Sequence, residues 1–360
     1  MDKIKGLDKL ITDALNNGFF PSANYCLVVK DKSYFNSFGN KTLIPEKEEN
    51  NLDTLYDMAS CTKVIATTTS IFLLLERGLL RLHDSVSMYL KEFKYPNVTI
   101  WDLMTHTSGL PAGVGGSNDA TIPELKERIF NLSMQYEKNT KIVYSDVGFM
   151  LLGFIIEEIS GMPLDEFTKV NVFDKLEMYR SGYSRISNPR FDYSDCAATE
   201  IRNDSLVQGL VRGKVHDERA YMLDGVAGHA GLFSNVKDIE HFIRMILDDG
   251  MYNGKRFLSK ASIDLMFTPQ VRETNGVSLN VTQRGLGWIV SGDYPGCGDL
   301  ASKETIHHTG FTGTNIFIDR INKIGFSLLT NRVHPTRSNT LIIPFRGKLG
   351  NYIIANFGGE

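Results

Sequence analysis

The chain has 360 residues, of which 42% are hydrophobic and 22% are charged. This composition is typical of a folded globular protein, and the length allows one large composite domain or two interleaved lobes. The 39 basic and 42 acidic residues give a net charge of -3 and are mixed along the chain. No charge pattern therefore indicates a nucleic acid or an anionic membrane as a partner.

The four cysteines, Cys26, Cys61, Cys196 and Cys297, lie far apart in the sequence. No C-x-x-C pair or zinc-type histidine spacing accompanies them, so we expect free thiols, no metal site and no cofactor. Residues 1–20 lack the apolar core of a signal peptide, and no run approaches the ~18 apolar residues of a membrane span. We therefore expect a cytoplasmic protein, unless a leader preceded this numbering.

Periodicity predicts helices and strands in a definite order along the chain. Residues 4–15 carry apolar side chains at helical spacing, and residues 24–29 and 33–38 form two strand-like runs that predict a hairpin. Helical periodicity then recurs over residues 64–75, 123–131, 147–159 and 238–247. Strand-like runs return at residues 285–290, 314–319 and 325–330, and a closing helix is expected after Pro335.

Strands near both termini with a long helical stretch between them predict an α+β fold. We expect an antiparallel sheet flanked by helices from both termini, plus an inserted, mostly helical lobe. Residues 1–58 and 235–360 are assigned to the sheet lobe and residues 59–234 to the helical lobe, together forming one domain. Clefts between lobes are where ligands usually bind, so we expect the functional site there.

Ser60 and Lys63 form an S-x-x-K motif at the start of an apolar helix. Residues three apart share one helical face, so the amine of Lys63 can reach the hydroxyl of Ser60. A serine is a poor nucleophile until an adjacent base takes its proton, and a desolvated lysine can supply or assist that base. Taken alone, the tetrapeptide is more often an ordinary helix cap.

Tyr144-Ser145-Asp146 precedes a second strongly apolar helix. A tyrosine near a cationic lysine can have a lowered pKa and act as a general base, and Asp146 can bind or orient a substrate amide. The alternative is an aspartate helix cap beside a tyrosine of the core.

His308-Thr309-Gly310 falls where a strand is expected. Gly310 and Gly313 let another segment approach the backbone closely, and a strand edge beside the nucleophile can offer backbone N–H groups to a developing oxyanion. The neighbouring His307 is interpreted as a solvated residue at the strand end.

The three motifs in this order resemble the serine β-lactamase and penicillin-binding protein superfamily. The separations, 84 residues from Ser60 to Tyr144 and 164 from Tyr144 to His308, resemble its class C β-lactamase-like branch. That branch includes D-Ala-D-Ala carboxypeptidases, D-amino-acid amidases and family VIII-type esterases. Residues 103–111, 228–234 and 329–335 also resemble stretches common in it, and the resemblance covers about residues 10–355.

The resemblance implies a mechanism without a cofactor. Ser60 would attack a carbonyl and form an acyl-enzyme, Lys63 and Tyr144 would handle the proton, and the backbone N–H groups of Ser60 and Phe311 would hold the oxyanion. His308 would complete the catalytic set.

The same resemblance implies substrate-binding roles for Asp146, Thr309 and Gly310. His106 and His229 lie in matching segments whose family positions are not catalytic, and they are interpreted as structural histidines of buried loops.

Two positions depart from the β-lactamases of this branch. Those β-lactamases carry lysine where this chain has His308, and usually asparagine where this chain has Asp146. Losing a cation and gaining a carboxylate should weaken the binding of a penicillin carboxylate. Histidine in the third motif occurs instead in the carboxypeptidases, amidases and some esterases, so we expect hydrolysis of an ester or amide, with an activity that changes as His308 titrates near about pH 6–7.

Other interpretations remain open from the sequence. A weakly catalytic penicillin-binding or sensor protein of the same fold is the main alternative. An ordinary α/β-hydrolase is disfavoured because no G-x-S-x-G elbow is present. Paired catalytic carboxylates at Glu157 and Glu158 are also disfavoured, because consecutive residues on a helix face different directions. The expected partner is a small ester, amide or β-lactam, and the oligomeric state is not predicted.

Overall fold

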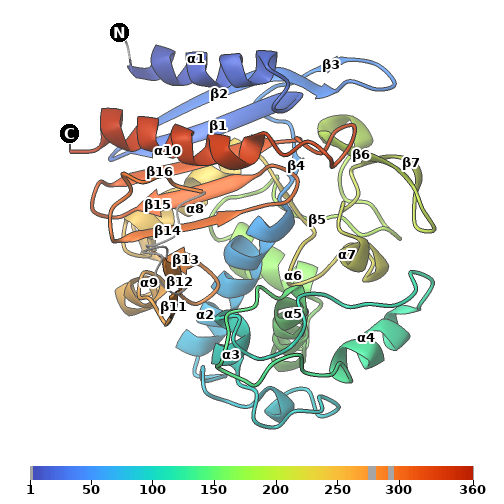
Figure 1. The fold of residues 1–360 in the computed structure, drawn as a ribbon. Coiled ribbons are helices and arrows are strands. Elements are labelled where there is room, and N and C mark those ends of the chain that lie inside the picture. Colours follow the sequence, from blue (N-terminus) through green and yellow to red (C-terminus); the bar gives the residue numbers. More distant parts are fainter. Residues whose placement is uncertain (1–2, 275–280, 291–295, 360) are drawn as a thin grey trace.

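The computed structural model describes residues 3–274, 281–290 and 296–359 (Figure 1). A nine-stranded sheet combines strands from both ends of the chain in the order β11-β12-β13-β14-β15-β16-β1-β2-β3. Its strands are β1 (Ser22–Val29), β2 (Lys32–Thr42), β3 (Glu48–Glu49), β11 (Val271–Thr274), β12 (Val281–Arg284), β13 (Ile289–Val290), β14 (Thr305–Thr309), β15 (Asn315–Asp319) and β16 (Ile324–Thr330).

The pairing of this sheet confirms the expected topology. β1 and β2 form the predicted antiparallel hairpin, and β1 also pairs antiparallel with β16, with Ala23 opposite Thr330. The first and last long strands of the chain are therefore neighbours, as an antiparallel sheet built from both termini requires.

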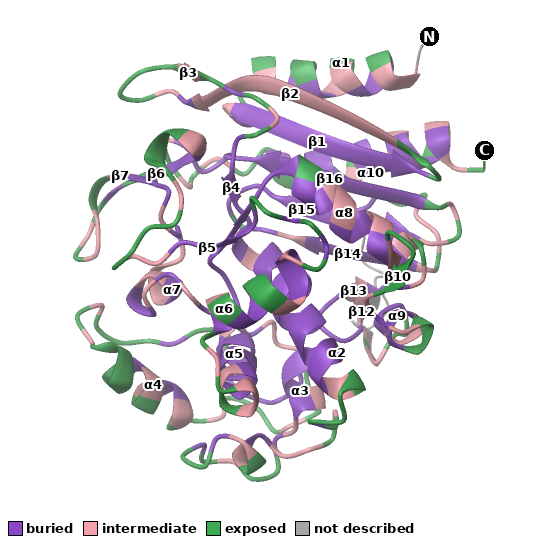
Figure 2. Cartoon of the chain, turned by 180° about the vertical axis from the view of Figure 1, so that it is seen from behind, coloured by how far each residue is buried: buried purple, intermediate pink, exposed green. Residues whose placement is uncertain are grey.

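Helices cover both faces of the sheet. α1 (Lys3–Asn16) and α10 (Ile342–Phe357) lie side by side on one face, and α8 (Val236–Leu247) packs on the other (Figure 1). Side chains of β1 alternate accordingly: Tyr25 and Leu27 join the cluster of α1 and α10, whereas Cys26 and Val28 join the larger core. β1 is thus buried along its whole length, as Figure 2 shows.

The other half of the molecule holds most of the remaining helices. They are α2 (Thr69–Glu76), α3 (Ile100–Met104), α4 (Ile122–Phe130), α5 (Asp146–Ser160), α6 (Leu164–Thr168) and α7 (Glu218–Met222), with α9 (Lys260–Met266) beside the sheet. The four helices predicted within the middle of the chain are present, and the α+β class is confirmed. The boundaries assigned to the two lobes stay a prediction.

Short strand pairs were not anticipated in this half. β4 (Tyr56–Asp57), β8 (Leu232–Ser234) and β5 (Gly182–Tyr183) form one small sheet, β6 (Ala198–Asn203) pairs with β7 (Gln208–Arg212), and β9 (Met251–Tyr252) pairs with β10 (Lys255–Arg256). Most of these strands have two or three residues, which leave too few positions for an alternating pattern, so sequence periodicity does not reveal them. β6 and β7 are longer, with six and five residues, but carry charged and polar side chains that give no clear apolar alternation.

The strand predicted over residues 285–290 is wrong for its first four residues. Only Ile289 and Val290 belong to a strand there. Gly285 N–H bonds to the Trp288 carbonyl, and Gly287, with φ of +79°, bonds through its N–H to the Met104 carbonyl. A positive φ favours a glycine turn over an extended strand, which explains the difference.

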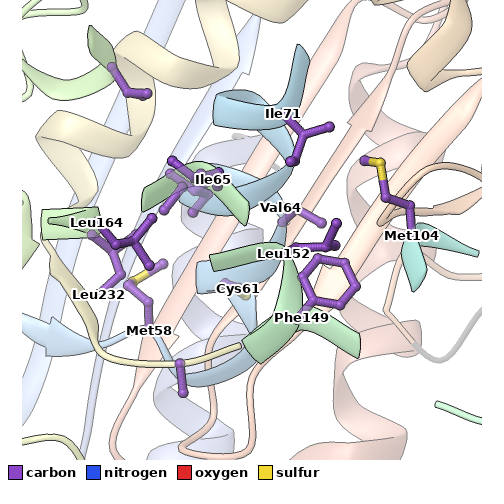
Figure 3. Packing of buried hydrophobic residues seen from close by; sticks show 14 of the residues in the cluster. Met58, Cys61, Val64, Ile65, Ile71, Met104, Phe149, Leu152, Leu164 and Leu232 are labelled. Atoms are coloured by element: carbon purple, nitrogen blue, oxygen red, sulfur yellow. The ribbon is translucent and has the colours of Figure 1, made fainter. Parts of the chain in front are cut away.

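The helix that begins at the nucleophile is a core element. Ala59–Glu76 is long and apolar enough to match a membrane span, contrary to the expectation from sequence, but 83% of it is buried inside the structure. Figure 3 shows Cys61, Val64 and Ile65 of this segment packed beside Phe149 and Leu152 of α5. Such burial is that of the core helix of a globular protein.

Candidate active site

Ser60 and Lys63 lie at the N-terminal end of the core helix. Lys63 Nζ lies 3.0 Å from Ser60 Oγ, 3.0 Å from the carbonyl oxygen of His229 and 2.7 Å from Asp146 Oδ1. The contacts with Ser60 and with the His229 carbonyl are hydrogen bonds, and the contact with Asp146 is an ion pair. The Lys63 side chain is fully buried, so it can act on a substrate through neighbours such as these.

The charge of Lys63 is set by two opposing effects. Burial lowers the pKa of the lysine, but the negative charge of Asp146 and the contacts with Tyr144 outweigh it, so the pKa lies above its usual value. An opposite charge within hydrogen-bonding distance favours the charged form of a buried group. The resting site therefore holds an ammonium ion beside the nucleophile rather than a free amine.

Tyr144 packs directly against this ammonium. The centre of its ring lies 4.9 Å from Lys63 Nζ and 4.8 Å from the centre of the His106 ring. Burial raises the pKa of Tyr144, and the opposing charge of Lys63 does not reverse the rise. The expectation that Lys63 gives Tyr144 a lowered pKa is wrong, because desolvation of the phenolate costs more than the cation returns. The phenol is neutral at rest.

The second motif is held at the start of α5 by polar contacts with one loop. Ser145 Oγ accepts the Gly148 N–H at 3.2 Å and donates to the Pro111 carbonyl at 2.7 Å, so Ser145 is the cap of α5. His106 Nδ1 accepts the Ser145 N–H at 3.1 Å. Asp146 is consequently free of the capping role and turns its carboxylate to Lys63, with 32% of its side chain exposed.

The third motif is fastened to the backbone that precedes Ser60. Thr312 Oγ1 donates to the Asp57 carbonyl at 2.7 Å, and Thr314 Oγ1 donates to the Met58 carbonyl at 2.9 Å. A Cβ at Gly310 would lie 2.6 Å from the Met58 carbonyl oxygen, so only glycine permits this approach. Two hydroxyls and one glycine thus bring the end of β14 to the nucleophile.

The backbone around the nucleophile has the form of an oxyanion site. Ala59 has a φ of +46°, and its N–H donates to Asp57 Oδ1 at 2.8 Å. Such a conformation is uncommon for alanine and is typical of functional turns. Within the described part of the chain, the Phe311 N–H donates to no protein acceptor. The two N–H groups proposed for the oxyanion are those of Ser60 and Phe311. Their segments are joined by the hydrogen bonds of Thr312 and Thr314.

His308 does not behave as expected near neutral pH. Burial, followed by the charges of Lys63 and Arg284, holds its pKa well below the usual value. With Nδ1 3.0 Å from the Thr309 carbonyl oxygen, the neutral ring donates from Nδ1 and keeps a lone pair on Nε2. The prediction that activity follows the titration of His308 near pH 6–7 is therefore wrong.

The two structural histidines and His307 are all buried. His106 supports Ser145, and His229 presents its carbonyl to Lys63 while its Nε2 lies 2.8 Å from Asp217 Oδ1. His307 was expected to be solvated, but its side chain is enclosed on β14. The sequence does not reveal this because burial of that strand depends on distant segments.

A pocket of about 440 Å³ opens at the nucleophile. Its lining includes Ser60, Tyr144, Ile289, His308, Thr309, Gly310, Phe311, Thr340 and Ile343, together with four arginines: Arg284, Arg332, Arg337 and Arg346. Asp146 is not part of this lining. The structure thus brings together Ser60, Lys63, Tyr144 and His308, and pairs Asp146 with Lys63.

Sequence reasoning missed the arginines. Arg346 is buried on α10, its Nη2 donates to the carbonyls of Gly310 and Thr314 at 2.8 Å, and burial lowers its pKa to about 10. Arg332 donates to the Phe311 carbonyl at 2.7 Å and lies over the Phe311 ring. Arg332 stands in a segment that resembled the family, but isolated arginines far apart in sequence carry no motif.

A family model described as Beta-lactamase matches residues 7–349 of this chain. The chain belongs to the beta-lactamase family. A relative from Escherichia coli K12, named "Putative D-alanyl-D-alanine carboxypeptidase", is 31% identical over 397 aligned positions, which cover 99% of this chain and 89% of that protein. The resemblance drawn from the three motifs is confirmed.

Solved structures show the same fold. A penicillin-binding protein homologue from Caulobacter crescentus has a TM-score of 0.77 at 16% identity, covering 99% of this chain and 98% of that one. EstCE1, described as a hydrolase with promiscuous acyltransferase activity, has a TM-score of 0.76 at 19% identity, covering 97% and 98%. Family and relatives together support a function of the serine hydrolase type.

Among the described residues, no group of three or more histidine, cysteine, aspartate or glutamate side chains is arranged to hold a metal ion. The chemistry considered below uses only side chains and backbone groups.

Proposed function

We propose that this protein is an acyl-serine hydrolase that cleaves an amide or ester whose leaving group carries a carboxylate, as the terminal residue of a D-alanyl-D-alanine peptide does. The observation that carries the proposal is the position of Ser60, in contact with the Lys63 ammonium at the mouth of an arginine-lined pocket. The relative named as a carboxypeptidase supports the same substrate class.

Ser60 is the nucleophile in this proposal. Its oxygen attacks the substrate carbonyl, and the N–H groups of Ser60 and Phe311 bind the oxygen that becomes negative. Tyr144 is a neutral phenol, so it serves as a hydrogen-bond and proton donor toward the departing group. Water then releases the acyl group from Ser60.

The pocket supplies positive charge where His308 supplies none. His308 is neutral, and Arg284 lies on the same side of the site, 5.6 Å from the centre of the Tyr144 ring. Guanidinium groups bind carboxylates through paired, charge-assisted hydrogen bonds. A substrate carboxylate beside the scissile bond is therefore held by arginine in this chain, and Arg284 is our first candidate.

Hydrolysis of matched substrates tests this function. An N-acetylated peptide ending in D-alanyl-D-alanine, its C-terminal amide and p-nitrophenyl acetate are compared for the wild type and Ser60→Ala. We expect turnover of the free-carboxylate peptide to exceed that of the amidated one, and Ser60→Ala to abolish all turnover. Equal rates with and without the carboxylate would contradict the substrate class, and retained turnover in Ser60→Ala would contradict the mechanism.

Arg284→Gln tests the carboxylate contact. Loss of one charge-assisted hydrogen bond costs about 1.5–3 kcal/mol, so KM for the free-carboxylate peptide should rise about 10- to 100-fold. Turnover of p-nitrophenyl acetate, which has no carboxylate, should not change. Arg81→Gln, a variant of an arginine whose side chain is 81% exposed, is the control and should match the wild type on both substrates.

A further inference from the structure

Ser60, Lys63 and Asp146 form a continuous line of polar contacts. Ser60 Oγ lies 3.0 Å from Lys63 Nζ, which in turn lies 2.7 Å from Asp146 Oδ1. Among the described residues, Asp146 supplies the one carboxylate within 4.0 Å of this ammonium. A carboxylate can take up a proton, so Asp146 gives the site a group that can accept one from Lys63.

Within the described ranges, the titratable side chains that bond to Ser60 are those of Lys63 and Tyr144. Lys63 is an ammonium ion and Tyr144 a neutral phenol, because burial raises the pKa of the tyrosine and Asp146 helps to raise that of the lysine. His308 has a lone pair, but its Nδ1–H faces the Thr309 carbonyl and its ring lies 6.1 Å from that of Tyr144. A serine that must lose a proton therefore needs a base one step further away.

We propose that Asp146 accepts, through Lys63, the proton that Ser60 loses when it attacks the substrate. This inference rests on the proposed function and deepens it, because it reassigns Asp146 from substrate binding to proton transfer. Asp146 does not touch the reacting atoms and is a positioning residue that acts through Lys63.

The proton transfers balance over the acylation half of the reaction. Lys63 gives one proton to Asp146 Oδ1 and takes the proton of Ser60, while the Ser60 Oγ–carbon bond forms and the carbonyl electron pair moves to its oxygen. When that pair returns, the bond to the leaving group breaks. The leaving group takes a proton from Tyr144, Lys63 replaces the proton of Tyr144, and Asp146 returns its proton to Lys63. The site ends with the ammonium and carboxylate it began with, and with an ester on Ser60.

The surroundings of Lys63 suit this route. Its ammonium is bounded by the ring of Tyr144, the ring of Phe149 at 5.8 Å and the carbonyl of His229. The other ionisable groups that face it are Cys61 on its own helix, His106 from the loop before α4, Asp217 behind His229 and His308 on β14. Burial raises the pKa of Cys61 to about 11 and keeps the pKa values of His106 and His308 low, so all three are neutral near pH 7.

Asp146→Asn, with Asp146→Glu beside it, tests the proton route. The asparagine keeps the shape of the side chain but accepts no proton, and without the carboxylate burial lowers the pKa of Lys63. We expect kcat/KM for p-nitrophenyl acetate at pH 7 to fall about 100-fold or more and then to rise with pH as the free amine of Lys63 forms. Asp146→Glu keeps a carboxylate and should retain the shape of the wild-type pH profile at a lower rate.

Glu157→Gln is the matched control. Glu157 lies on the same helix with the same 32% exposure and pairs with Lys126, away from the nucleophile. The pH profile of kcat/KM for Glu157→Gln should equal that of the wild type. A wild-type pH profile in Asp146→Asn would overturn this inference while leaving the proposed function standing. Absence of Ser60-dependent turnover in the wild type would instead overturn the proposed function and this proton route with it.

Discussion

Two clusters of charged residues contact residues that line the pocket, and they are built differently. One is the pair of Lys63 and Asp146, in which the cation is fully enclosed and the carboxylate is partly exposed. The other surrounds Glu200, whose carboxylate accepts from Arg337 Nε at 2.6 Å and lies 3.0 Å from His216 Nε2. In the first cluster a reactive hydroxyl is one of the contacts, whereas the second consists of hydrogen bonds from Arg337 and a contact with His216.

We assign proton transfer to the pair of Lys63 and Asp146, and stabilisation of the fold to the cluster around Glu200. Burial raises the pKa of Glu200, but the hydrogen bonds from His216 and Arg337 outweigh it and lower the pKa to about 2. His216 also stacks on the ring of Phe311, whose backbone N–H we propose for the oxyanion, with 5.7 Å between ring centres. Glu200 thus holds Arg337 and His216 at the wall of the pocket.

Lys63→Met should give the largest separation of activity from stability. Removing the ammonium breaks the proton path from Ser60, and kcat should fall on the order of 1,000-fold, as for other members of a catalytic unit. Removing one partner of a buried pair usually destabilises a protein, but Asp146 keeps 32% of its side chain exposed to water, so the fall in melting temperature should be small beside the loss of kcat. Ester hydrolysis and thermal unfolding measure the two effects, and near wild-type turnover would remove Lys63 from the mechanism.

Glu200→Gln should show the opposite behaviour. A lowered pKa stabilises the fold at pH values above the unfolded value of about 4.5, and this contribution disappears as the pH falls toward about 2. The substitution should therefore lower the free energy of unfolding at pH 7 by about 2–3 kcal/mol and have progressively less effect below pH 4. Urea unfolding at several pH values checks this. A large loss of kcat without loss of stability would show that the two clusters are not distinct.

Asp217→Asn should have the smallest effect. Asp217 caps α7 and lies 2.8 Å from His229 Nε2, so it fixes the loop whose carbonyl contacts Lys63. Asparagine is an equally good helix cap, which leaves one weakened hydrogen bond worth about 1 kcal/mol, or about fivefold in kcat. Steady-state kinetics on p-nitrophenyl acetate measure it, and an unchanged kcat would mean that the His229 loop is fixed by other contacts.

Much of the fold was predictable because local patterns and tertiary packing agree. The hairpin of β1 and β2 and the helix α5 carry clear periodicity, and the S-x-x-K spacing places Lys63 against Ser60 on one helical face. In these elements the contacts that define the structure are made between residues close together in the sequence.

The rest depends on contacts that no local pattern encodes. The neutral state of Tyr144 follows from burial among residues from three distant segments, and the turn at Gly287 is set by the Met104 carbonyl. Arg346 reaches the pocket from the last helix, 286 positions after Ser60 in the sequence. The protonation state of Tyr144, the turn at Gly287 and the position of Arg346 are therefore set only when the distant segments of the core have packed together.

The central claim, that Ser60 is the acylated nucleophile, is tested most directly by intact-mass measurement after incubation with a fluorophosphonate that traps reactive serines. We predict a single phosphonyl adduct on the wild type, mapped to the peptide that contains Ser60, and no adduct on a folded Ser60→Ala variant. An adduct of equal yield on Ser60→Ala, or ester turnover by a wild type that remains unlabelled at Ser60, would contradict the account.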